Sequence, residues 1–357
     1  MFFLSKNLNV YILGVLKMEY KPNIQDVAKL ANVSIATVSR VINNQGGVRK
    51  ETEERILKAI NELGYIRNAA ARTMKRKETN TIGVIVPDIK NPFFPLVMAG
   101  IEQKAREKQY FTILSSTNES PIVEKEIVKN FIERGVDGVI ITTANENGDH
   151  LKLLQEQGIP IVAVDRSIKS FEVDTVLVDN VKGAYQAVQH LILQGHEKIA
   201  IICGPQTTTP GRDRFLGYKK ALENYNIPLD ERYVIQGDFG EQSGYLATQK
   251  LFALDDKPTA IFSSNNLMTI GCVKALEELN WKLGSEVSFI GFDDVDIATF
   301  LNPKLSVVSR PMYALGEIAF QLLHERICFK ENLPKRKYLL SPELKIRQSC
   351  RLVKTLF

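Results

Sequence analysis

The chain has 357 residues, of which 44% are hydrophobic and 24% charged, and its formal net charge is +5. This length exceeds what one hydrophobic core usually holds, and the composition excludes collagen, coiled coils and disorder. The four cysteines lie far apart without a C-x-x-C pair, so we expect a reduced, cytoplasmic protein without structural zinc. The apolar stretch from Leu8 to Leu16 is too short to span a membrane and lacks a signal-peptide cleavage site.

Positive charge is concentrated near the start of the chain. Residues 20–79 hold twelve Lys and Arg against six Asp and Glu, whereas the rest of the chain is nearly balanced. A basic segment joined to a nearly neutral body is typical of a nucleic-acid-binding module. On charge alone, a solvated basic face without a partner stays open as an alternative.

Two short helical patterns follow each other in this basic segment. Apolar residues recur at helical spacing, first at Ile24, Val27, Ala28, Leu30 and Ala31, then at Ile35, Val38, Val41 and Ile42. Between them, Asn32 to Ser34 predicts a turn followed by an N-cap at Ser34. This is a helix-turn-helix pattern. With Val38 and Val41 facing inward, the second helix would enter a major groove, where Arg40 can grip guanine through O6 and N7.

A third helix is predicted from Lys50 to Leu63, with Ile56, Leu57, Ile60 and Leu63 at core spacing and a C′ glycine at Gly64. The next segment, NAAARTMKRK at residues 68–77, is basic and rich in alanine. It is too short to be a stable helix by itself, so it folds when docked on an acidic partner or remains a flexible basic linker.

From Thr81 onward, short apolar runs alternate with amphipathic helical patterns. The runs are TIGVIVP, FTILSST, GVIITT and IPIVAVD up to Asp165, then KIAIICG, TAIFSSN and VSFIGFD from Lys198 to Asp293. Continuous apolar runs of this length predict parallel strands that are covered on both faces and joined by right-handed crossovers. The fold class is therefore α/β, with two doubly wound parallel sheets behind the helical head.

Polar residues gather where the predicted strands end. They are Asp88, Asp165, Asn265 with Asn266, and Asp293 with Asp294. Ligands of such sheets bind beyond the carboxyl ends of the strands, so we expect a ligand site there.

An enzyme is the rival class. The chain contains no G-x-G, no G-x-x-x-x-G-K-[ST], no H-E-x-x-H and no G-x-S-x-G, and its four histidines show no motif spacing. We therefore expect no catalytic residues and no cofactor, and an α/β enzyme is a much weaker alternative.

Several motifs in the right order resemble one family. The runs DVAKLANVSIATVSRVINN, LGYIRNAAART, TIGVIVPDIKNPFF and the final RQSC are similar to those of the bacterial lactose/galactose repressor (LacI/GalR) family of transcription factors, and the match covers Pro22 to Cys350. The resemblance implies a homodimer or tetramer that binds a near-palindromic double-stranded operator, a hinge helix in the minor groove, and a body like a periplasmic sugar-binding protein.

The resemblance also supplies domain boundaries. We expect an extension at residues 1–19 that is disordered or not translated, a helix-turn-helix domain at 20–67, a hinge at 68–80 and an effector-binding domain at 81–357. Lobe 1 is expected at about 81–179 and 310–333, and lobe 2 at about 180–309 and 334–350.

Carried over residue by residue, the resemblance predicts two sites. The DNA-binding residues are Ser34, Ile35, Ala36, Thr37, Ser39, Arg40, Asn43, Asn68, Ala71, Arg72, Met74 and Lys75. The effector-binding residues are Phe93, Phe94, Asp165, Arg214, Phe239, Asn265 and Asp293. Planar Arg and carboxylates suit the paired hydroxyls of a sugar, and an aromatic face suits its apolar side.

Two positions depart from the family pattern. Met74 stands where the family leads us to expect Leu at the minor-groove wedge, and Asn266 stands where an Asp is usual. The missing carboxylate, with Arg166 and Arg212 nearby in sequence, favours a neutral or an anionic sugar. Within the same class, a catabolite-control regulator that responds to a phosphorylated partner protein is the alternative.

Overall fold

The computed structural model describes residues 22–43, 45–65, 79–329 and 334–353. The chain divides into two compact units, residues 1–77 and 78–357. The described part of the first unit holds three helices, α1 (Ile24–Leu30), α2 (Ile35–Ile42) and α3 (Lys50–Leu63). The predicted N-cap at Ser34 and the C′ glycine Gly64, with φ of 60°, are both confirmed.

The core of this head is small. It consists of Val27, Ala28, Ala31, Val38, Val41, Ile56 and Ala59. Leu30 and Leu57 were predicted to face this core, but each is 49% exposed. Such short helices bury only a narrow stripe, and Leu57 lies about 100° around α3 from the fully buried Ile56.

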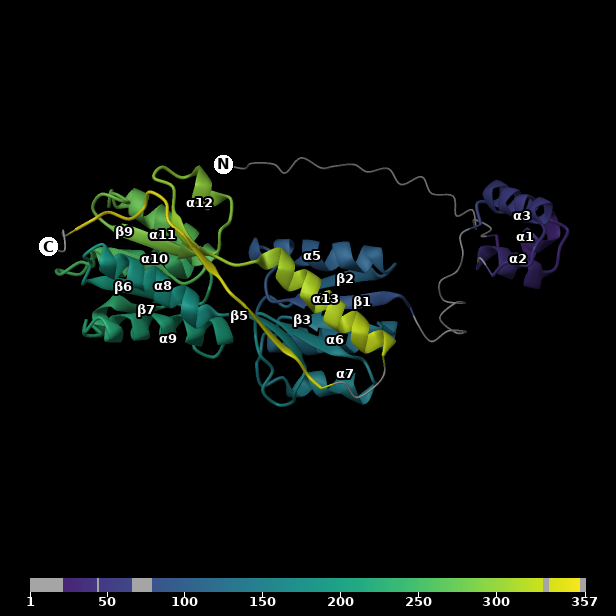
Figure 1. Cartoon of the computed structure of the whole chain (residues 1–357), viewed down its shortest axis with the longest axis horizontal. Coiled ribbons are helices and arrows are strands. Elements are labelled where there is room, and N and C mark those ends of the chain that lie inside the picture. Colours follow the sequence, from purple (N-terminus) through teal and green to yellow (C-terminus); the bar gives the residue numbers. More distant parts are fainter. Residues whose placement is uncertain (1–21, 44, 66–78, 330–333, 354–357) are drawn as a thin grey trace, which may run out of the picture. The chain divides into compact units, whose positions relative to one another are not determined.

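The second unit contains two parallel-dominated sheets, one in each lobe (Figure 1). The sheet of lobe 1 has the order β11-β5-β4-β3-β1-β2 and the sheet of lobe 2 the order β12-β10-β9-β8-β6-β7. The strands of lobe 1 are β1 (Thr81–Val86), β2 (Phe111–Ser116), β3 (Gly138–Ile141), β4 (Ile161–Val164), β5 (Asp174–Val178) and β11 (Lys337–Leu340). The strands of lobe 2 are β6 (Ile199–Cys203), β7 (Val234–Gln236), β8 (Ala260–Ser263), β9 (Ser288–Phe292), β10 (Ser306–Ser309) and β12 (Glu343–Lys345).

Helices cover both faces of each sheet. Lobe 1 carries α5 (Phe93–Glu107), α6 (Pro121–Arg134), the 3-10 helix η1 (Asp149–Leu151), α7 (Lys152–Glu156) and α13 (Met312–Cys328). Lobe 2 carries α8 (Asn180–Leu193), α9 (Thr209–Asn224), η2 (Glu231–Tyr233), α10 (Glu241–Phe252), α11 (Asn266–Glu278) and α12 (Ile297–Phe300). Successive strand residues enter different cores: Val84 packs with α5 and α13, whereas Ile85 packs with α6.

Three segments carry the chain from one lobe to the other. They follow β5, β10 and β11, and the second one places α13 beside α5 in lobe 1 (Figure 1). No helix among the described residues is long and apolar enough to cross a membrane.

Two expectations need correction. Residues 334–350 were assigned to lobe 2, but β11 pairs with β5, so the chain returns to lobe 2 only after Leu340. The second concerns β2, which was expected to be covered on both faces. It is an edge strand on which Phe111 is 72% exposed. An edge strand lacks a neighbour on one side, so its apolar run is not evidence of full burial.

Candidate DNA-binding surface and effector cleft

The predicted recognition helix α2 is fixed by its cap and by two buried valines. The Ser34 hydroxyl accepts a hydrogen bond from the Thr37 amide at 3.2 Å and lies 2.8 Å from the Thr37 hydroxyl. Val38 and Val41 face the core of the head. The helix therefore turns its other side outward, where Ile35, Ala36 and Arg40 are exposed.

The remaining predicted DNA contacts divide into two groups. Asn43 and Ser39 lie one turn apart on α2, and the Asn43 amide donates to the Ser39 carbonyl at 2.6 Å and to its hydroxyl at 3.1 Å. This pair caps the C-terminal end of α2. The hinge residues Asn68, Ala71, Arg72, Met74 and Lys75 lie outside the described residues.

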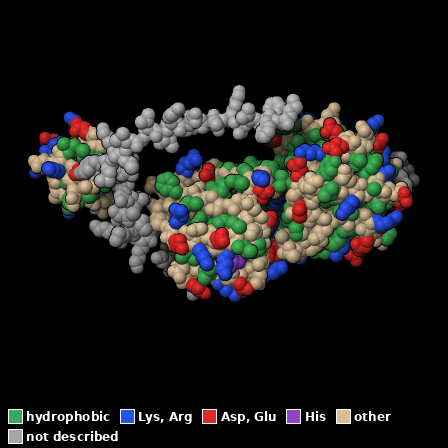
Figure 2. Space-filling model, turned by 180° about the vertical axis from the view of Figure 1, so that it is seen from behind, with side chains coloured by type: hydrophobic (Ala, Val, Ile, Leu, Met, Phe, Trp, Pro, Cys, Tyr) green, Lys and Arg blue, Asp and Glu red, His purple; other side chains and the backbone are tan. Residues whose placement is uncertain are grey.

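A cavity of about 490 Å³ lies between the two lobes of the body. Its walls come from strand ends and helix starts of both lobes, and charged side chains line the seam between the lobes (Figure 2). All seven predicted effector residues line it, namely Phe93, Phe94, Asp165, Arg214, Phe239, Asn265 and Asp293. Its size is within the range of small-molecule sites.

Arg310 lines this cavity, on the segment that connects β10 of lobe 2 to α13 of lobe 1. We call the buried side chains of Arg310, Asp165, Asp293 and Arg214 the floor of the cleft. Arg310 Nη1 donates to Asp165 Oδ1 at 2.6 Å, while Nε and Nη2 donate to the two Asp293 oxygens at 2.5 and 2.8 Å. The guanidinium also stacks 3.7 Å from the Phe93 ring centroid. All three charged side chains are buried, so one arginine joins carboxylates of both lobes.

Arg310 was not among the predicted site residues. An Arg between a strand end and a helix-starting proline, at a predicted lobe crossover, is the signal that could have indicated it. Burial lowers the pKa of Arg310, but the charges of Asp293 and Asp165 outweigh it and leave the pKa raised.

Arg214, at the start of α9, is buried in lobe 2. Its Nε donates to Asn180 Oδ1 at 2.8 Å and its Nη1 to the Ser264 carbonyl at 2.6 Å. The guanidinium lies 3.8 Å from the centroid of Phe292, whereas Nη2 has no hydrogen-bond partner within the described part of the chain. Burial, with repulsion from Arg310, lowers the pKa of Arg214 to about 9, so the group remains charged at neutral pH.

The polar atoms of the Asn265 side chain form hydrogen bonds with backbone groups of neighbouring segments. Its Oδ1 accepts from the Met268 amide at 2.9 Å and caps α11, while its Nδ2 donates to the Phe239 carbonyl at 2.9 Å. Phe239 has a φ of 71°, a conformation rare for a residue with a side chain. Asn265 therefore stabilises the backbone that presents the Phe239 ring.

Phe93 and Phe94 have a double role. Both are buried in the lobe 1 core with their rings edge to face at 5.0 Å, and both also border the cavity. Core packing therefore accounts for most of their burial.

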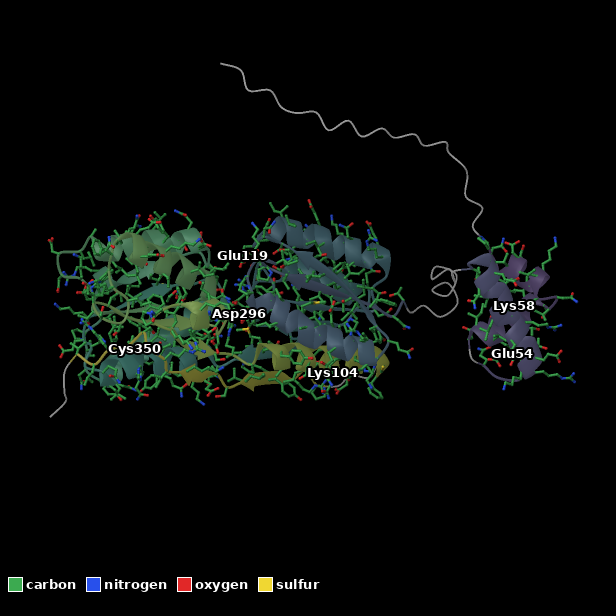
Figure 3. The ribbon with its side chains drawn as sticks, turned by 90° about the horizontal axis from the view of Figure 1, so that it is seen from above. Glu54, Lys58, Lys104, Glu119, Asp296 and Cys350 are labelled. Carbon is green, nitrogen blue, oxygen red and sulfur yellow. The ribbon has the colours of Figure 1, made fainter. Side chains whose placement is uncertain are left out.

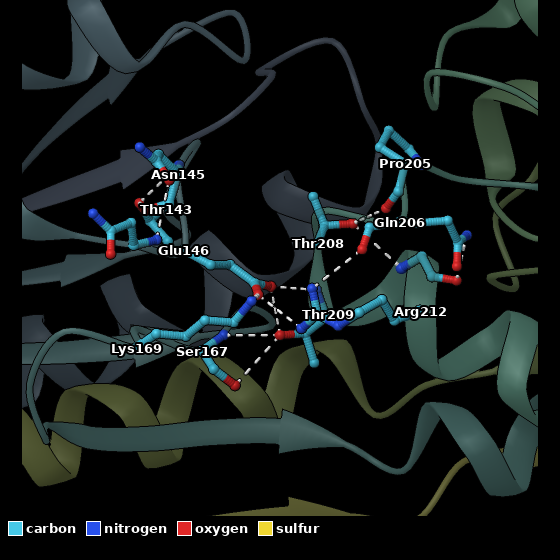
Figure 4. Close-up of polar contacts among 12 residues, drawn as sticks. Thr143, Asn145, Glu146, Ser167, Lys169, Pro205, Gln206, Thr208, Thr209 and Arg212 are labelled. Carbon is cyan, nitrogen blue, oxygen red and sulfur yellow. Dashed lines mark hydrogen bonds and ion pairs between the residues drawn. The ribbon is translucent and has the colours of Figure 1, made fainter.

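Two further contacts join the two lobes. The Asn266 side chain donates to Asn91 Oδ1 at 2.8 Å. In the second contact, buried Glu146 accepts from the backbone amide of Thr209, from its hydroxyl at 2.5 Å and from Arg212 at 2.8 Å (Figure 4). Asn91 and Glu146 belong to lobe 1 and their partners to lobe 2, so both contacts bridge the lobes.

The arginines expected to make the cleft positive are already paired. Arg166 donates to both Glu119 oxygens at 2.7 Å, and Glu119 lies at the boundary between the lobes (Figure 3). Arg212 is paired with Glu146 at 2.8 Å. The positive charges of Arg166 and Arg212 are therefore matched within the protein, and they do not by themselves favour an anionic sugar over a neutral one.

Comparisons with known proteins agree with this architecture. Residues 17–68 match the bacterial regulatory proteins of the lacI family, and residues 79–350 match the periplasmic binding proteins and sugar-binding domain of the LacI family. The chain is 34% identical to catabolite control protein A of Priestia megaterium, over 91% of this chain and 98% of the relative. It is 35% identical to the regulator DegA of Bacillus subtilis (strain 168), over 92% and 98%.

Solved structures give the same result. The lac repressor dimer bound to operator and the anti-inducer ONPF superimposes with a TM-score of 0.83 at 25% identity, over 93% of this chain and all of that chain. The complex of the transcriptional regulator CelR with cellobiose gives a TM-score of 0.71 at 29% identity, over 92% of this chain and all of that chain. The chain is a member of the LacI family of bacterial transcriptional regulators.

Proposed function

We propose that this regulator is a repressor of carbohydrate-use genes whose operator affinity is controlled by a small sugar-like effector bound between the two lobes. One observation carries the proposal: the cavity of about 490 Å³ joins both lobes and brings together carboxylates, guanidinium groups and aromatic rings. Polar groups at the rim and floor orient hydroxyls, and rings cover an apolar face. We expect neither a cofactor nor catalysis.

The DNA-binding part of the proposal rests on the exposed side of α2. Ile35, Ala36 and Arg40 lie on that side, with Ser34, Thr37, Ser39 and Asn43 around them. An arginine and small apolar side chains on an exposed helix are suited to base edges in a major groove. The basic hinge, with Arg72, Lys75 and Met74, would contact phosphates and the minor groove at the operator centre.

A homodimer in the cytoplasm completes the proposal, because a near-palindromic operator matches a two-fold axis. Lobe 1 exposes apolar side chains along one edge, including Leu96 on α5 and Phe111 and Leu114 on β2. A second copy packed on this edge would remove them from water. The related lac repressor was solved as a dimer on its operator.

The test uses the full chain and an operator selected from random duplex DNA. Fluorescence anisotropy measures the operator affinity while sugars are added, and calorimetry measures sugar binding. We expect a sugar to bind and to change the operator affinity. If no sugar binds, and a phosphorylated partner protein changes the affinity instead, the catabolite-control alternative holds; similarity to catabolite control protein A is what favours it.

A further inference from the structure

We propose that Arg310 sets the charge of the cleft floor to zero and thereby restricts the cleft to uncharged ligands, so that neutral sugars bind and sugar acids and amino sugars are rejected. This inference rests on the proposed function, since it names the class of effector that the same cavity accepts.

The floor contains four buried charges. Asp165 and Asp293 are negative, Arg214 and Arg310 are positive, and each of these residues is less than a tenth exposed. All four border the same cavity. Because Arg214 keeps its charge at neutral pH even with its pKa lowered to about 9, the four charges cancel.

The other charged groups at the cavity do not alter this balance. Arg166 is also buried, but Glu119 neutralises it through two hydrogen bonds of 2.7 Å. Lys90 and Asp238 line the mouth and are exposed, and Asp88 there is partly exposed. Water and salt screen exposed groups strongly, so they contribute little to the selection of ligand charge.

A neutral polyol meets this floor without adding a charge. Arg214 lines the cavity, and its buried Nη2, which has no partner in the described residues, can donate to a ligand hydroxyl that reaches it. A ligand carboxylate or ammonium would instead add a fifth charge to a floor whose two negative and two positive charges already cancel. Burying such an unpaired charge costs free energy. The floor therefore discriminates between ligands by their charge.

Arg310 is the group on which this balance depends. It contacts both carboxylates, with three hydrogen bonds of 2.5 to 2.8 Å, and so holds both in one arrangement. Replacing it by Gln would leave the floor with one excess negative charge. Replacing Asp293 by Asn would leave one excess positive charge. The two variants should therefore change ligand preference in opposite directions.

The experiment is calorimetry of the full chain at about pH 6.5, where a sugar amine is protonated. D-Glucose, D-galactose, D-ribose and cellobiose are tested first, and the best binder is then compared with its acid and its amino derivative. For the wild-type protein we expect both derivatives to bind at least tenfold more weakly than the neutral parent. In Arg310→Gln, the affinity for the amino derivative should rise about tenfold relative to the affinity for the neutral parent. In Asp293→Asn, the affinity for the acid should rise about tenfold relative to the same parent.

The matched controls are Arg232→Gln and Asp230→Asn, which remove the same charges from an ion pair on the lobe 2 surface. Their preferences should equal those of the wild-type protein. Circular dichroism confirms folding, and the wild-type comparison stands even if a variant does not fold. Tighter wild-type binding of either charged derivative would overturn the inference, as would two cleft variants that change preference no more than the controls. If no sugar of any charge binds, the proposed function fails and the inference fails with it.

Discussion

Asp165 and Asp293 occupy equivalent positions in the two lobes. Asp165 follows β4 and Asp293 follows β9, which stand at the same place in the order of the two sheets. Their φ values are 65° and 78°, and their amides donate to the neighbouring strands, to Val176 and Val308, at 2.9 and 2.8 Å. Both are held in a sparsely populated conformation that points them toward the cleft, where Arg310 bridges them.

This bridge should contribute strongly to stability. Arg310→Ala leaves two buried carboxylates without their shared cation, so we expect the free energy of unfolding to fall by about 3–5 kcal/mol. The control Arg232→Ala breaks an exposed pair and should change it by no more than about 1 kcal/mol. Urea unfolding of the body, followed by circular dichroism, measures both. Equal losses in the two variants would show that the bridge contributes no more to the stability of the fold than an exposed ion pair does.

Glu146 should favour lobe closure. Glu146→Ala removes the acceptor shared by Thr209 and Arg212 of the other lobe. The free energy of ligand binding must then bring the lobes together without these hydrogen bonds. We expect the effector to bind roughly tenfold more weakly, since hydrogen bonds to a charged group contribute about 1.5–3 kcal/mol. Asp149→Ala, which removes an exposed carboxylate paired with Lys152, is the control. Calorimetry checks the prediction, and unchanged effector affinity in Glu146→Ala would contradict it.

The stability of lobe 2 should depend on pH through His196. This buried ring lies 2.9 Å from the Thr259 hydroxyl and 3.2 Å from the Arg351 carbonyl, and burial lowers its pKa from 6.5 to about 4. The unfolded chain therefore binds a proton that the folded chain does not, and stability should fall as pH decreases from about 6.5 to about 4. The loss is on the order of 3 kcal/mol.

Urea unfolding at several pH values checks this loss. His196→Gln carries no titrating ring, so its stability should vary less over the same pH range. If the free energy of unfolding varied with pH in the same way in the wild-type protein and in the variant, the pH dependence would come from groups other than His196.

Arg40 should read a base in each half-site. Arg40→Ala should cost about 1–3 kcal/mol of operator affinity and relax the preference at one base pair per half-site. Arg55, an exposed arginine on α3, provides the control, because Arg55→Ala removes the same charge away from α2. Anisotropy titrations with the selected operator and with single-base variants measure both. A variant that loses affinity equally on every sequence would make Arg40 a phosphate contact instead.

Local signals made much of the fold predictable. Ser34 and Gly64 were found because a cap and a C′ glycine depend on a few neighbouring residues. The seven apolar runs all became strands, but β5, β7 and β10 were not predicted. The assignment of β11 to lobe 2 was also wrong. Its pairing with β5 joins residues about 160 positions apart, so tertiary structure decides it.

The candidate site divides in the same way. Asp165 and Asp293 were predicted since each directly follows an apolar strand. The roles of Arg310 and Glu146 depend on partners in the other lobe: Arg310 and Asp165 are 145 positions apart. The local motif around Arg310 can mark it as a candidate, but no local pattern encodes its contacts with the other lobe, so only the folded chain reveals its partners.

A ligand in the cleft should control DNA binding through Arg214. Anisotropy measurements of the operator affinity of the wild-type protein and of Arg214→Ala, with and without the sugar that binds the wild-type protein, test this coupling. The wild-type affinity should change by roughly 5–150-fold, the range of a coupling of about 1–3 kcal/mol. Arg214→Ala should bind the operator as the wild-type protein does without sugar, and the same sugar concentration should leave its affinity unchanged. If Arg214→Ala still responded at that concentration, the coupling between the cleft and the DNA-binding head would not depend on Arg214.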